Sequence, residues 1–329
     1  MTNNQLFDLK KLVILSEISK GSFGIVYKVQ CKETGNIYAA KILIEPVDDF
    51  SEDFVNIKRE INIISKINHP LILKFIGFNQ NNFQNEPHPV IITEFIKNGT
   101  LEDLIKSKNN TRINYYWNDT RKLITIYGIA SALSYLHSHK IHRDLKPQNI
   151  LIDDYLFPKI ADFGFSKIKH INQESISYSS NNFKGTPIYM SPEIWSNKEY
   201  SEASDVYAFS MIVYQIMTRE IPFKNYPVLE ILTKTNSGIR PEFNVEIPES
   251  YRLLIESCWS QKAEDRPTFD SILNKLKTDP GFITNTIKQQ NFVDFTNYID
   301  QFQIDSIIRK APPNDKFKKI DLNQKEIEI

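Results

Sequence analysis

Cysteine is scarce in this 329-residue chain, and neither sign of charge is in excess. The two cysteines, Cys31 and Cys258, are too few for the disulfide framework of a small secreted domain. We therefore expect two buried thiols in a reducing compartment. Forty Lys and Arg residues balance forty Asp and Glu residues, so no overall field favours nucleic acid or an anionic membrane as a partner.

Long apolar runs are also missing. The most hydrophobic helical stretch, Val206–Met217, is shorter than the ~20 residues that a bilayer-spanning helix needs. The segment Met1–Lys20 lacks a basic start followed by an apolar run, so no secretion signal is evident. These absences predict an intracellular, cytoplasmic protein without membrane insertion. With 41% hydrophobic residues, the chain still has enough apolar material for a substantial core.

The first part of the chain, to about residue 95, is dominated by strand patterns and contains one helix. Five stretches are typical of strands: Leu12–Ile18, Ile25–Cys31, Ile37–Ile44, Ile72–Phe78 and Val90–Phe95. Thr34-Gly35-Asn36 is typical of a hairpin turn. Between the third and fourth strands, apolar residues recur at helical spacing and predict one buried helix face: Phe54, Ile57, Ile61 and Ile64.

The remainder of the chain favours helices. One helix is predicted by an apolar stripe: Leu123, Ile126, Ala130 and Leu133. Val206–Met217 is apolar nearly all round, which predicts a helix buried at the centre of a domain. A small strand-rich lobe therefore precedes a larger helical lobe, and residues 94–99 connect them. A cleft between two such lobes is where a small cofactor would bind.

A glycine-containing hairpin is predicted between the first two strands. Its sequence is Ile18-Ser19-Lys20-Gly21-Ser22-Phe23-Gly24-Ile25-Val26. Glycines at such a turn let backbone amides approach phosphate oxygens without side chains in the way. Two glycines in a hairpin are more often only a turn, so the motif carries little weight by itself.

A lysine on the third strand and a glutamate on the following helix form a second candidate. Lys41 could neutralise phosphate charge, and Glu60 could hold its ammonium group in place. Taken singly, each is more simply an exposed, solvated side chain. Glu60 lies beside Ile61 and Ile64, at the edge of the buried helix face, where a partner is plausible.

Two further motifs identify a family. The first is Ile141-His142-Arg143-Asp144-Leu145-Lys146-Pro147-Gln148-Asn149-Ile150-Leu151, and the second, thirteen residues after Asn149, is Asp162-Phe163-Gly164. In this order they resemble the protein kinases. The resemblance covers residues 10–278 and implies an α+β fold with two lobes.

Within that fold, residues 10–95 would form an N-lobe with a five-stranded antiparallel sheet and one helix. Residues 94–99 would be the hinge, and residues 100–278 a larger, mainly helical C-lobe. Residues 1–9 would be an N-terminal extension.

The resemblance also assigns roles in phosphoryl transfer. Asp144 would be the catalytic base that accepts the proton of the substrate hydroxyl, and Lys146 would contact the transferring phosphoryl group. Asn149, a third catalytic residue, and Asp162 would hold Mg²⁺ through their side-chain oxygens. Lys41, braced by Glu60, would bind the α- and β-phosphates of ATP.

Nucleotide contacts are expected from the glycine hairpin, the third strand and its helix, the hinge and the second lobe. These residues are Ile18, Ser19, Lys20, Gly21, Ser22, Phe23, Gly24, Ile25, Val26, Ala39, Lys41, Glu60, Thr93, Glu94, Ile96, Leu151 and Asp162. Thr93 would lie at the back of the adenine pocket, and the backbone of Glu94 and Ile96 would bind adenine.

Other positions match structural features of kinases. A column of apolar side chains joining the lobes would contain Phe163, His142, Ile64 and Phe75. Asp205, at the start of the buried helix, would bind the backbone of the catalytic segment, although an aspartate is favourable at any helix start. Glu193 and Arg266 would form a buried ion pair.

The motifs also indicate the acceptor. Lys146 with Gln148-Asn149 is the serine/threonine pattern, as is the segment from Gly185 to Glu193. Residues 99–104 and 258–269 resemble the tyrosine-kinase-like group, whose members mainly phosphorylate serine and threonine. Phe165 favours a serine acceptor. The resemblance therefore implies a protein serine/threonine kinase that uses Mg-ATP in intracellular signalling.

A hydroxyl-rich stretch, residues 175–180, follows the second motif, and Thr186 lies downstream. Most hydroxyls in such a stretch belong to a polar loop and do nothing further. Because Arg143 precedes Asp144, its guanidinium could pair with a phosphate and order this segment. We predict activation by phosphorylation within residues 175–186, by an upstream kinase or by autophosphorylation.

Two positions depart from the kinase pattern. Ser19 replaces the first glycine of the phosphate loop, and Ser191 replaces the alanine before Pro-Glu. Neither change removes a charge or a ligand. The main alternative function is a pseudokinase scaffold that binds nucleotide without turnover, but such proteins typically lose the equivalents of Lys41, Asp144 or Asp162. A kinase of small alcohols fits the long activation segment less well.

Residues 279–329 form a C-terminal tail in which the resemblance ends. Apolar residues at helical spacing predict a helix over residues 289–310, ended by Pro312-Pro313: Phe292, Phe295, Ile299 and Phe302. The helix would either pack on the helical lobe or dock a partner. Residues 314–329 are charged and predicted to be disordered.

Overall fold

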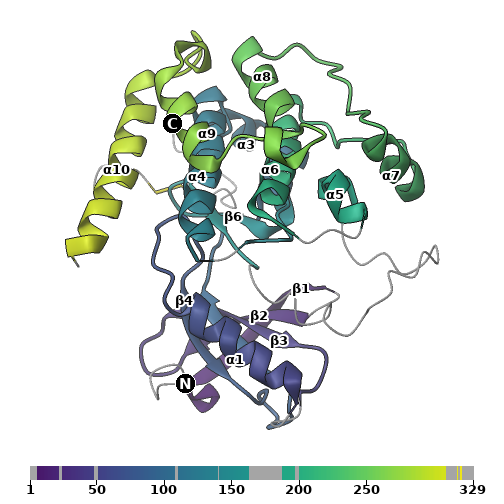
Figure 1. Ribbon diagram of the computed structural model, residues 1–329. Coiled ribbons are helices and arrows are strands. Elements are labelled where there is room, and N and C mark those ends of the chain that lie inside the picture. Colours follow the sequence, from purple (N-terminus) through teal and green to yellow (C-terminus); the bar gives the residue numbers. More distant parts are fainter. Residues whose placement is uncertain are drawn as a thin grey trace. The chain divides into compact units, whose positions relative to one another are not determined.

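Figure 1 shows the computed structural model, which describes residues 6–21, 24–47, 51–107, 110–139, 141–162, 187–196, 200–308, 317 and 319–320. The chain forms two compact units. Of the described residues, the first unit holds 6–68 and 72–96, and the second holds 69–71 and those from 97 onward. The predictions for Ser22, Phe23, Phe163 and residues 175–186 lie outside the described residues.

The first unit is built on a five-stranded antiparallel sheet with the order β1-β2-β3-β5-β4. Its strands are β1 (Leu12–Lys20), β2 (Gly24–Cys31), β3 (Ile37–Leu43), β4 (Phe75–Asn79) and β5 (Val90–Glu94). Gly35 turns the β2–β3 connection with a φ of 72°, a conformation that glycine adopts without steric cost. The predicted sheet is thereby confirmed.

The strand predicted from Ile72 begins only at Phe75. Leu71 and Ile72 are nearly inaccessible to solvent, at 1% and 2% exposure, yet they precede the strand. Their apolar character reflects burial in the connection and not strand pairing, because a short apolar run does not separate the two cases.

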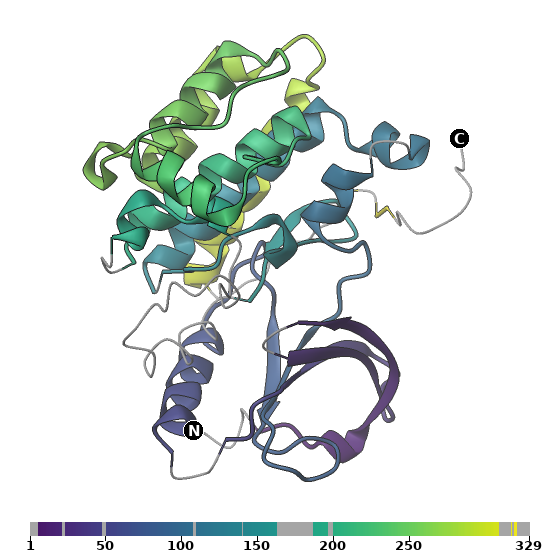
Figure 2. The same ribbon diagram turned by 90° about the vertical axis from the view of Figure 1, so that its right-hand side faces the viewer.

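Among the described residues of the first unit, one α-helix is present, α1 (Glu52–Ile64). The hydroxyl of Ser51 accepts a hydrogen bond from the Phe54 backbone N–H and caps the start of the helix. The predicted face is buried, and its residues are Phe54, Ile57, Ile61 and Ile64. Figure 2 shows the sheet of this unit as a curved layer with α1 running along one side.

The second unit is mainly helical. Its helices are α2 (Leu101–Lys106), α3 (Thr111–Tyr116), α4 (Asp119–His137), α5 (Pro192–Trp195), α6 (Glu202–Thr218), α7 (Val228–Asn236), α8 (Glu249–Cys258), α9 (Phe269–Thr278) and α10 (Gln289–Ile308). A two-stranded antiparallel sheet joins β6 (Ile150–Ile152) to β7 (Pro158–Ile160). Short 3₁₀ turns lie at Leu9–Lys11 in the first unit and at Pro147–Asn149, Pro187–Tyr189, Ala263–Asp265 and Pro280–Phe282 in the second.

Two helices form the core of the second unit. The predicted stripe of α4 is fully buried, and its residues are Leu123, Ile126, Ala130 and Leu133. Helix α6 is buried on nearly all sides from Ser204 to Ile216, as its apolar sequence predicts. Helices α6, α9 and α10 each contact α4 (Figure 1). None of the helices within the described ranges is both long and apolar enough to span a membrane.

Helix α10 packs on α4, and the face that carries Phe292, Phe295 and Ile299 is buried. Phe295 and Ile299 are 0% and 1% exposed. The rings of Phe292 and Phe295 meet Tyr127 of α4 edge-on, at centroid distances of 5.5 and 6.1 Å. Of the two interpretations of this helix, packing on the helical unit is the one the structure supports.

The prediction of disorder over residues 314–329 is wrong for Phe317, Lys319 and Ile320. Phe317 packs against other aromatic rings, and Ile320 forms backbone hydrogen bonds with the second unit. The prediction used the average composition of the stretch, which is charged, and so did not register the packing of its one aromatic residue. The prediction of two buried thiols is confirmed, because Cys31 and Cys258 are both buried and free.

A buried histidine lies between α4 and α10. His69 is 5% exposed, stacks on Tyr135 at 4.9 Å and meets Phe302 edge-on at 6.0 Å. Its Nδ1 accepts a hydrogen bond from the Leu71 N–H, and its buried Nε2 has no hydrogen-bond partner among the described residues. Burial lowers the pKa of His69 from 6.5 to about 3, and the charge of Lys159 adds to this effect.

We predict that His69 makes the fold acid-sensitive. Below pH 6.5 the unfolded chain binds a proton at His69 that the folded chain does not bind until about pH 3. The contribution of His69 to the free energy of unfolding is therefore fully present above pH 6.5. It falls on acidification, by about 2 kcal/mol between pH 7 and pH 5. Urea unfolding should show that His69→Asn loses less stability than wild type over this interval, by about that amount.

Asn is chosen because its side-chain oxygen can still accept the Leu71 N–H. The matched control is His139→Asn, which replaces an exposed histidine on the same aromatic neighbour, Tyr135. This control should leave the His69 contribution in place. Equal pH dependence in wild type and His69→Asn would contradict the prediction.

Candidate functional site

The candidate catalytic segment is held through its backbone by one buried carboxylate. Asp205, in the first turn of α6, is 2% exposed and accepts hydrogen bonds from the backbone N–H groups of His142 (2.7 Å) and Arg143 (2.9 Å). The predicted role of Asp205 is thereby confirmed. His137, at the end of α4, places its Nε2 2.8 Å from the same carboxylate.

Arg143 adopts a left-handed conformation, with a φ of 72°. Such a conformation costs a residue with a side chain roughly 1–2 kcal/mol. The two hydrogen bonds that Asp205 accepts offset this cost, because they fix the peptide groups on either side of His142. The strained turn is the point at which the chain is redirected just before Asp144.

Asp144 is fixed by two neighbours in the sequence. Lys146 Nζ donates to both of its carboxylate oxygens, at 3.0 and 2.8 Å. Asn149 Nδ2 donates to the Asp144 carboxylate at 3.0 Å and to its backbone carbonyl at 2.8 Å. The side chain keeps 26% of its surface exposed, so it is both positioned and accessible.

His142 links this segment to the β6–β7 hairpin. Its Nδ1 accepts the Asp144 N–H at 3.3 Å, so its Nε2 carries the proton and donates to the Ala161 carbonyl at 3.0 Å. The ring is completely buried. The His142 ring therefore links the carbonyl group just before Asp162 to the backbone N–H of Asp144.

The hairpin also brings together the two predicted metal ligands. Ile150 lies opposite Ile160, and the Ala161 N–H donates to the Asn149 carbonyl, so Asn149 and Asp162 are neighbours across the hairpin. Because Asn149 Nδ2 donates to Asp144, its Oδ1 is the atom left for a cation. An amide oxygen and a carboxylate are hard donors, and this donor set fits Mg²⁺. Leu151 follows on β6, opposite Lys159.

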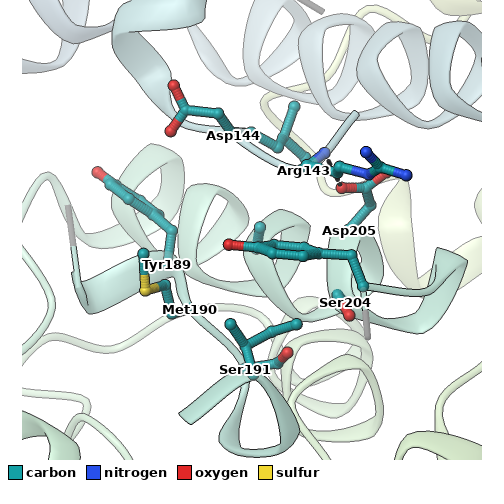
Figure 3. Close-up of a pocket in the computed structure, with 11 residues that line it drawn as sticks. Arg143, Asp144, Tyr189, Met190, Ser191, Ser204 and Asp205 are labelled. Atoms are coloured by element: carbon teal, nitrogen blue, oxygen red, sulfur yellow. Dashed lines mark hydrogen bonds between the residues drawn. The ribbon is translucent and has the colours of Figure 1, made fainter. Parts of the chain in front are cut away.

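A pocket adjoins Asp144 within the second unit (Figure 3). Eleven residues line it: Arg143, Asp144, Leu145, Tyr189, Met190, Ser191, Ile194, Tyr200, Ser204, Asp205 and Ala208. The hydroxyl of Tyr189 donates to Gln215 Oε1 at 2.9 Å. Burial raises the pKa of both Tyr189 and Tyr200, and the Asp144 carboxylate further raises that of Tyr200. Both phenols therefore stay neutral near pH 7.

The wall of this pocket is anchored by an ion pair. Arg266 donates to the two carboxylate oxygens of Glu193 at 2.7 and 2.8 Å and to the Ala203 carbonyl at 2.8 Å. Burial acts to raise the pKa of Glu193, but the hydrogen bonds and charge of Arg266 outweigh it, and the pKa is lowered. The predicted pair is confirmed, and it fixes the helix that begins after Ser191.

In the first unit, the sheet collects several predicted nucleotide residues on one face. Val26 lies opposite Lys41, and Ala39 lies opposite Thr93. Directly opposed residues share a face of a sheet, as do residues two apart on a strand, so these four side chains lie on the same face. Ile25 alternates to the other face. Glu60 is half-buried on α1.

Three further hairpin residues, Ser19, Gly21 and Gly24, lie at or beside the end of the β1–β2 pair. A Cβ on Gly24 would come within 2.5 Å of the Ile42 carbonyl oxygen, so close packing on β3 requires a glycine there. A Cβ on Gly21 would meet nothing nearer than 3.9 Å. Ser19 lies opposite Val26 in β1 and is not among the described residues with positive φ, so serine fits the position.

Three features of the site were not predicted from the sequence. These are the contact of His137 with Asp205, the bond from Tyr189 to Gln215, and the direct ion pair between Lys146 and Asp144. The first two join residues far apart in the chain and leave no local pattern. The third could have been suspected, because both residues lie in the same short motif.

The model of the protein kinase domain matches this chain over residues 12–276. The dual specificity protein kinase shkC of Dictyostelium discoideum is 33% identical over 286 residues, which are 84% of this chain and 53% of that protein. A protein of the same organism, provisionally named as a serine/threonine-protein kinase, is 34% identical over 272 residues, 82% of this chain and 28% of its own length.

A protein of Acanthamoeba polyphaga mimivirus, provisionally named as a serine/threonine-protein kinase/receptor, is 32% identical over 260 residues. The match covers 78% of this chain and 15% of that protein. The chain thus spans between 15% and 53% of the length of these relatives.

We predict that Asp205→Ala releases the catalytic segment. The N–H groups of His142 and Arg143 would lose a buried acceptor, which costs about 1–3 kcal/mol for each unsatisfied group. Hydrogen exchange at these two amides should accelerate, and urea unfolding should show a loss of about 2–6 kcal/mol. The matched control is Glu249→Ala, which removes an exposed acid in the first turn of α8 and should leave exchange at both amides unchanged. Unchanged exchange at both amides in Asp205→Ala would contradict the role given to Asp205.

Proposed function

The chain belongs to the protein kinase family, and on that premise we propose that it is an active protein serine/threonine kinase in intracellular signalling. It would transfer the γ-phosphate of Mg-ATP to serine and threonine hydroxyls of protein substrates. The kinase domain would cover residues 10–278, with residues 1–9 and 279–329 as extensions. The observation that carries the proposal is the arrangement around Asp144, a partly exposed carboxylate held by Lys146 and Asn149.

In this proposal Asp144 accepts the proton of the attacking hydroxyl. A general base must be held within hydrogen-bond reach of that proton, and a fixed side chain meets this need better than a mobile one. Lys146, already bonded to Asp144, is placed to neutralise charge on the transferring phosphoryl group. The pocket beside Asp144 would receive the side chain that carries the hydroxyl.

Residues of the first unit would bind the nucleotide. The face that carries Val26, Ala39, Lys41 and Thr93 offers apolar surface for adenine and a cation for the phosphates. Glu60 would brace Lys41, and the backbone of the segment from Glu94 to Ile96 would bind the adenine edge. The glycine hairpin, residues 18–26, would cover the phosphates through its backbone amides.

Asn149 and Asp162 would hold Mg²⁺ through the oxygen atoms described above. The ion supplies charge neutralisation between the phosphate oxygens. The hydrogen bonds from Asn149 Nδ2 to Asp144 orient its oxygen before any ion binds.

The acceptor is proposed to be serine or threonine because of Lys146 and the segment 185–193. Membership of the tyrosine-kinase-like group, from residues 99–104 and 258–269, is part of the same proposal. One relative is named as a dual specificity kinase, so transfer to tyrosine is the outcome against which the acceptor must be tested.

We predict that Asp144→Asn loses phosphoryl transfer while keeping its fold. Asparagine cannot accept the hydroxyl proton, so incorporation of ³²P from Mg-[γ-³²P]ATP into a basic protein substrate should fall by about 10²–10⁴. The matched control is Asp265→Asn, an exposed acid of the second unit, which should retain wild-type incorporation. Phosphoamino-acid analysis of the product should give phosphoserine and phosphothreonine; phosphotyrosine in comparable amount would show dual specificity.

The same assay separates the active kinase from a pseudokinase. A folded wild-type protein that binds ATP, but incorporates no more label than Asp144→Asn even after treatment with an activating kinase, would overturn the proposal. Such a protein would be a scaffold that binds nucleotide without turnover.

Activation by phosphorylation is a further part of the proposal. The buried Nε of Arg143 has no hydrogen-bond partner among the described residues. A guanidinium group beside Asp144 whose Nε is left without a partner is suitable for binding a phosphate, because arginine binds phosphate oxygens through charge-assisted hydrogen bonds. The donor hydroxyl would lie within residues 175–186, and either an upstream kinase or this chain itself would phosphorylate it.

We predict that the hydroxyls of residues 175–180 control activity. Replacing Ser175, Ser177, Tyr178, Ser179 and Ser180 together with alanine should lower incorporation of ³²P at least about tenfold, as loss of one charge-assisted contact implies. Phosphatase treatment should lower wild-type activity by a similar factor and leave this variant unaffected. Full activity in the variant would exclude these residues and leave Thr186 to be tested by itself.

A further inference from the structure

An aromatic residue of the tail sits in a small cluster of rings on the second unit. The ring of Phe317 meets Phe157 edge-on at 5.0 Å and Tyr298 at 5.6 Å, and lies 6.5 Å from Tyr155. Phe157 and Tyr155 belong to the β6–β7 connection, whereas Tyr298 belongs to α10. Phe317 therefore fills a space between two elements that are distant in the sequence.

The backbone of Ile320 is bound in addition to this ring. Its N–H donates to the Asp154 carbonyl, and its carbonyl accepts from Asn98 Nδ2 at 2.9 Å. The same Asn98 nitrogen donates to the Asp153 carbonyl at 2.9 Å. Asn98 is 6% exposed. The backbone N–H and the carbonyl of one tail residue are thus both hydrogen-bonded to the second unit.

The receiving surface is held in place by its own hydrogen bonds. The Asp153 carboxylate accepts the N–H groups of Tyr155 and Phe157 at 2.8 and 2.9 Å. Arg121 Nη1 donates to the Tyr155 carbonyl at 3.0 Å. These contacts do not involve the tail, so the surface is formed without it. Lys319 adds a contact in which its ammonium group lies 5.7 Å from the centre of the Tyr155 ring.

We propose that Asn98, Asp153–Phe157 and Tyr298 form a docking surface for a short peptide. The peptide carries an aromatic residue, then a lysine two positions later and an aliphatic residue three positions later. The occupant of this surface is the tail of the same molecule, Phe317 to Ile320. The chain itself supplies this pattern once in the described tail.

The distance along the chain allows binding within one molecule. Ile308 ends α10, and Phe317 lies nine positions further along the chain. Nine steps of extended chain reach at most about 30 Å, whereas the ten helical steps from Tyr298 to Ile308 rise only about 15 Å. The tail can therefore return to Tyr298 without leaving its own molecule.

The net free energy of this contact is small enough to allow the tail to be released. Burial of one aromatic ring and two hydrogen bonds favours binding, whereas ordering several backbone residues opposes it by a similar amount. Asn98 follows Lys97, the residue at which the chain passes from the first unit into the second. Docking therefore pairs a side chain next to this crossing, and release of the tail would remove one of the two carbonyls to which its Nδ2 donates, that of Ile320, and leave that of Asp153.

The test compares full-length wild type with Phe317→Ala by hydrogen exchange. The amide of Ile320 is bonded in wild type and should exchange at least tenfold faster when Phe317 is removed, and the segment 97–104 should also lose protection. The matched control is Tyr115→Ala, which removes an aromatic ring that is 69% exposed in the same unit. A second variant, Ile320→Pro, removes the N–H that donates to Asp154 and keeps the Phe317 ring, and it should also lower protection over residues 97–104.

A peptide provides the complementary measurement. A synthetic peptide of residues 314–323, added to the Phe317→Ala protein, should restore protection over residues 97–104, and the same peptide with alanine in place of its phenylalanine should not. Identical hydrogen exchange in wild type and Phe317→Ala would overturn the proposed docking surface. A wild-type dimer in solution that becomes a monomer in Phe317→Ala would overturn binding within one molecule. Neither readout depends on phosphoryl transfer, so this proposal and the proposed kinase activity stand or fall separately.

Discussion

The buried carboxylate of Asp205 is the interaction on which the arrangement of the catalytic segment depends. A carboxylate is costly to bury unless its oxygens are hydrogen-bonded, and Asp205 satisfies them with two backbone N–H groups and the ring of His137. In return, it holds Arg143 in a left-handed conformation that this residue would otherwise avoid. A helix at the centre of the core thus determines the path of a loop at its surface. The position of Asp144 therefore depends on α6 as well as on hydrogen bonds within the loop.

Hydrogen bonds connect that loop to the two proposed metal ligands. His142 bonds to Ala161, and Asn149 pairs across the β6–β7 hairpin with the residue before Asp162. A movement of the loop would therefore shift the base and both proposed ligands together. The short bonds from Lys146 and Asn149 to Asp144 add a second constraint, since each fixes a side chain with a role of its own in the proposed reaction.

Much of this could be predicted from the sequence, for reasons that differ between the elements. Helix α1 and the core of α6 follow from apolar spacing, which is local, and the Asp144 segment follows from residues within one short motif. The Glu193–Arg266 pair was expected only through resemblance to a family, because no local pattern links residues 73 positions apart. The bond between His137 and Asp205 has no such support and was missed. The start of β4 was misplaced because burial and strand pairing both select apolar residues at Ile72.

The tail shows where composition fails as a guide. Its charged residues predict disorder because they cannot bury apolar surface among themselves. That argument treats the segment as isolated, whereas the Phe317 ring packs against Tyr155, Phe157 and Tyr298 of the second unit. The segment Asp153–Phe157 is itself held by hydrogen bonds that do not include the tail. The position of Phe317 therefore depends on the surface that it contacts, and the composition of residues 314–329 carries no information about that surface.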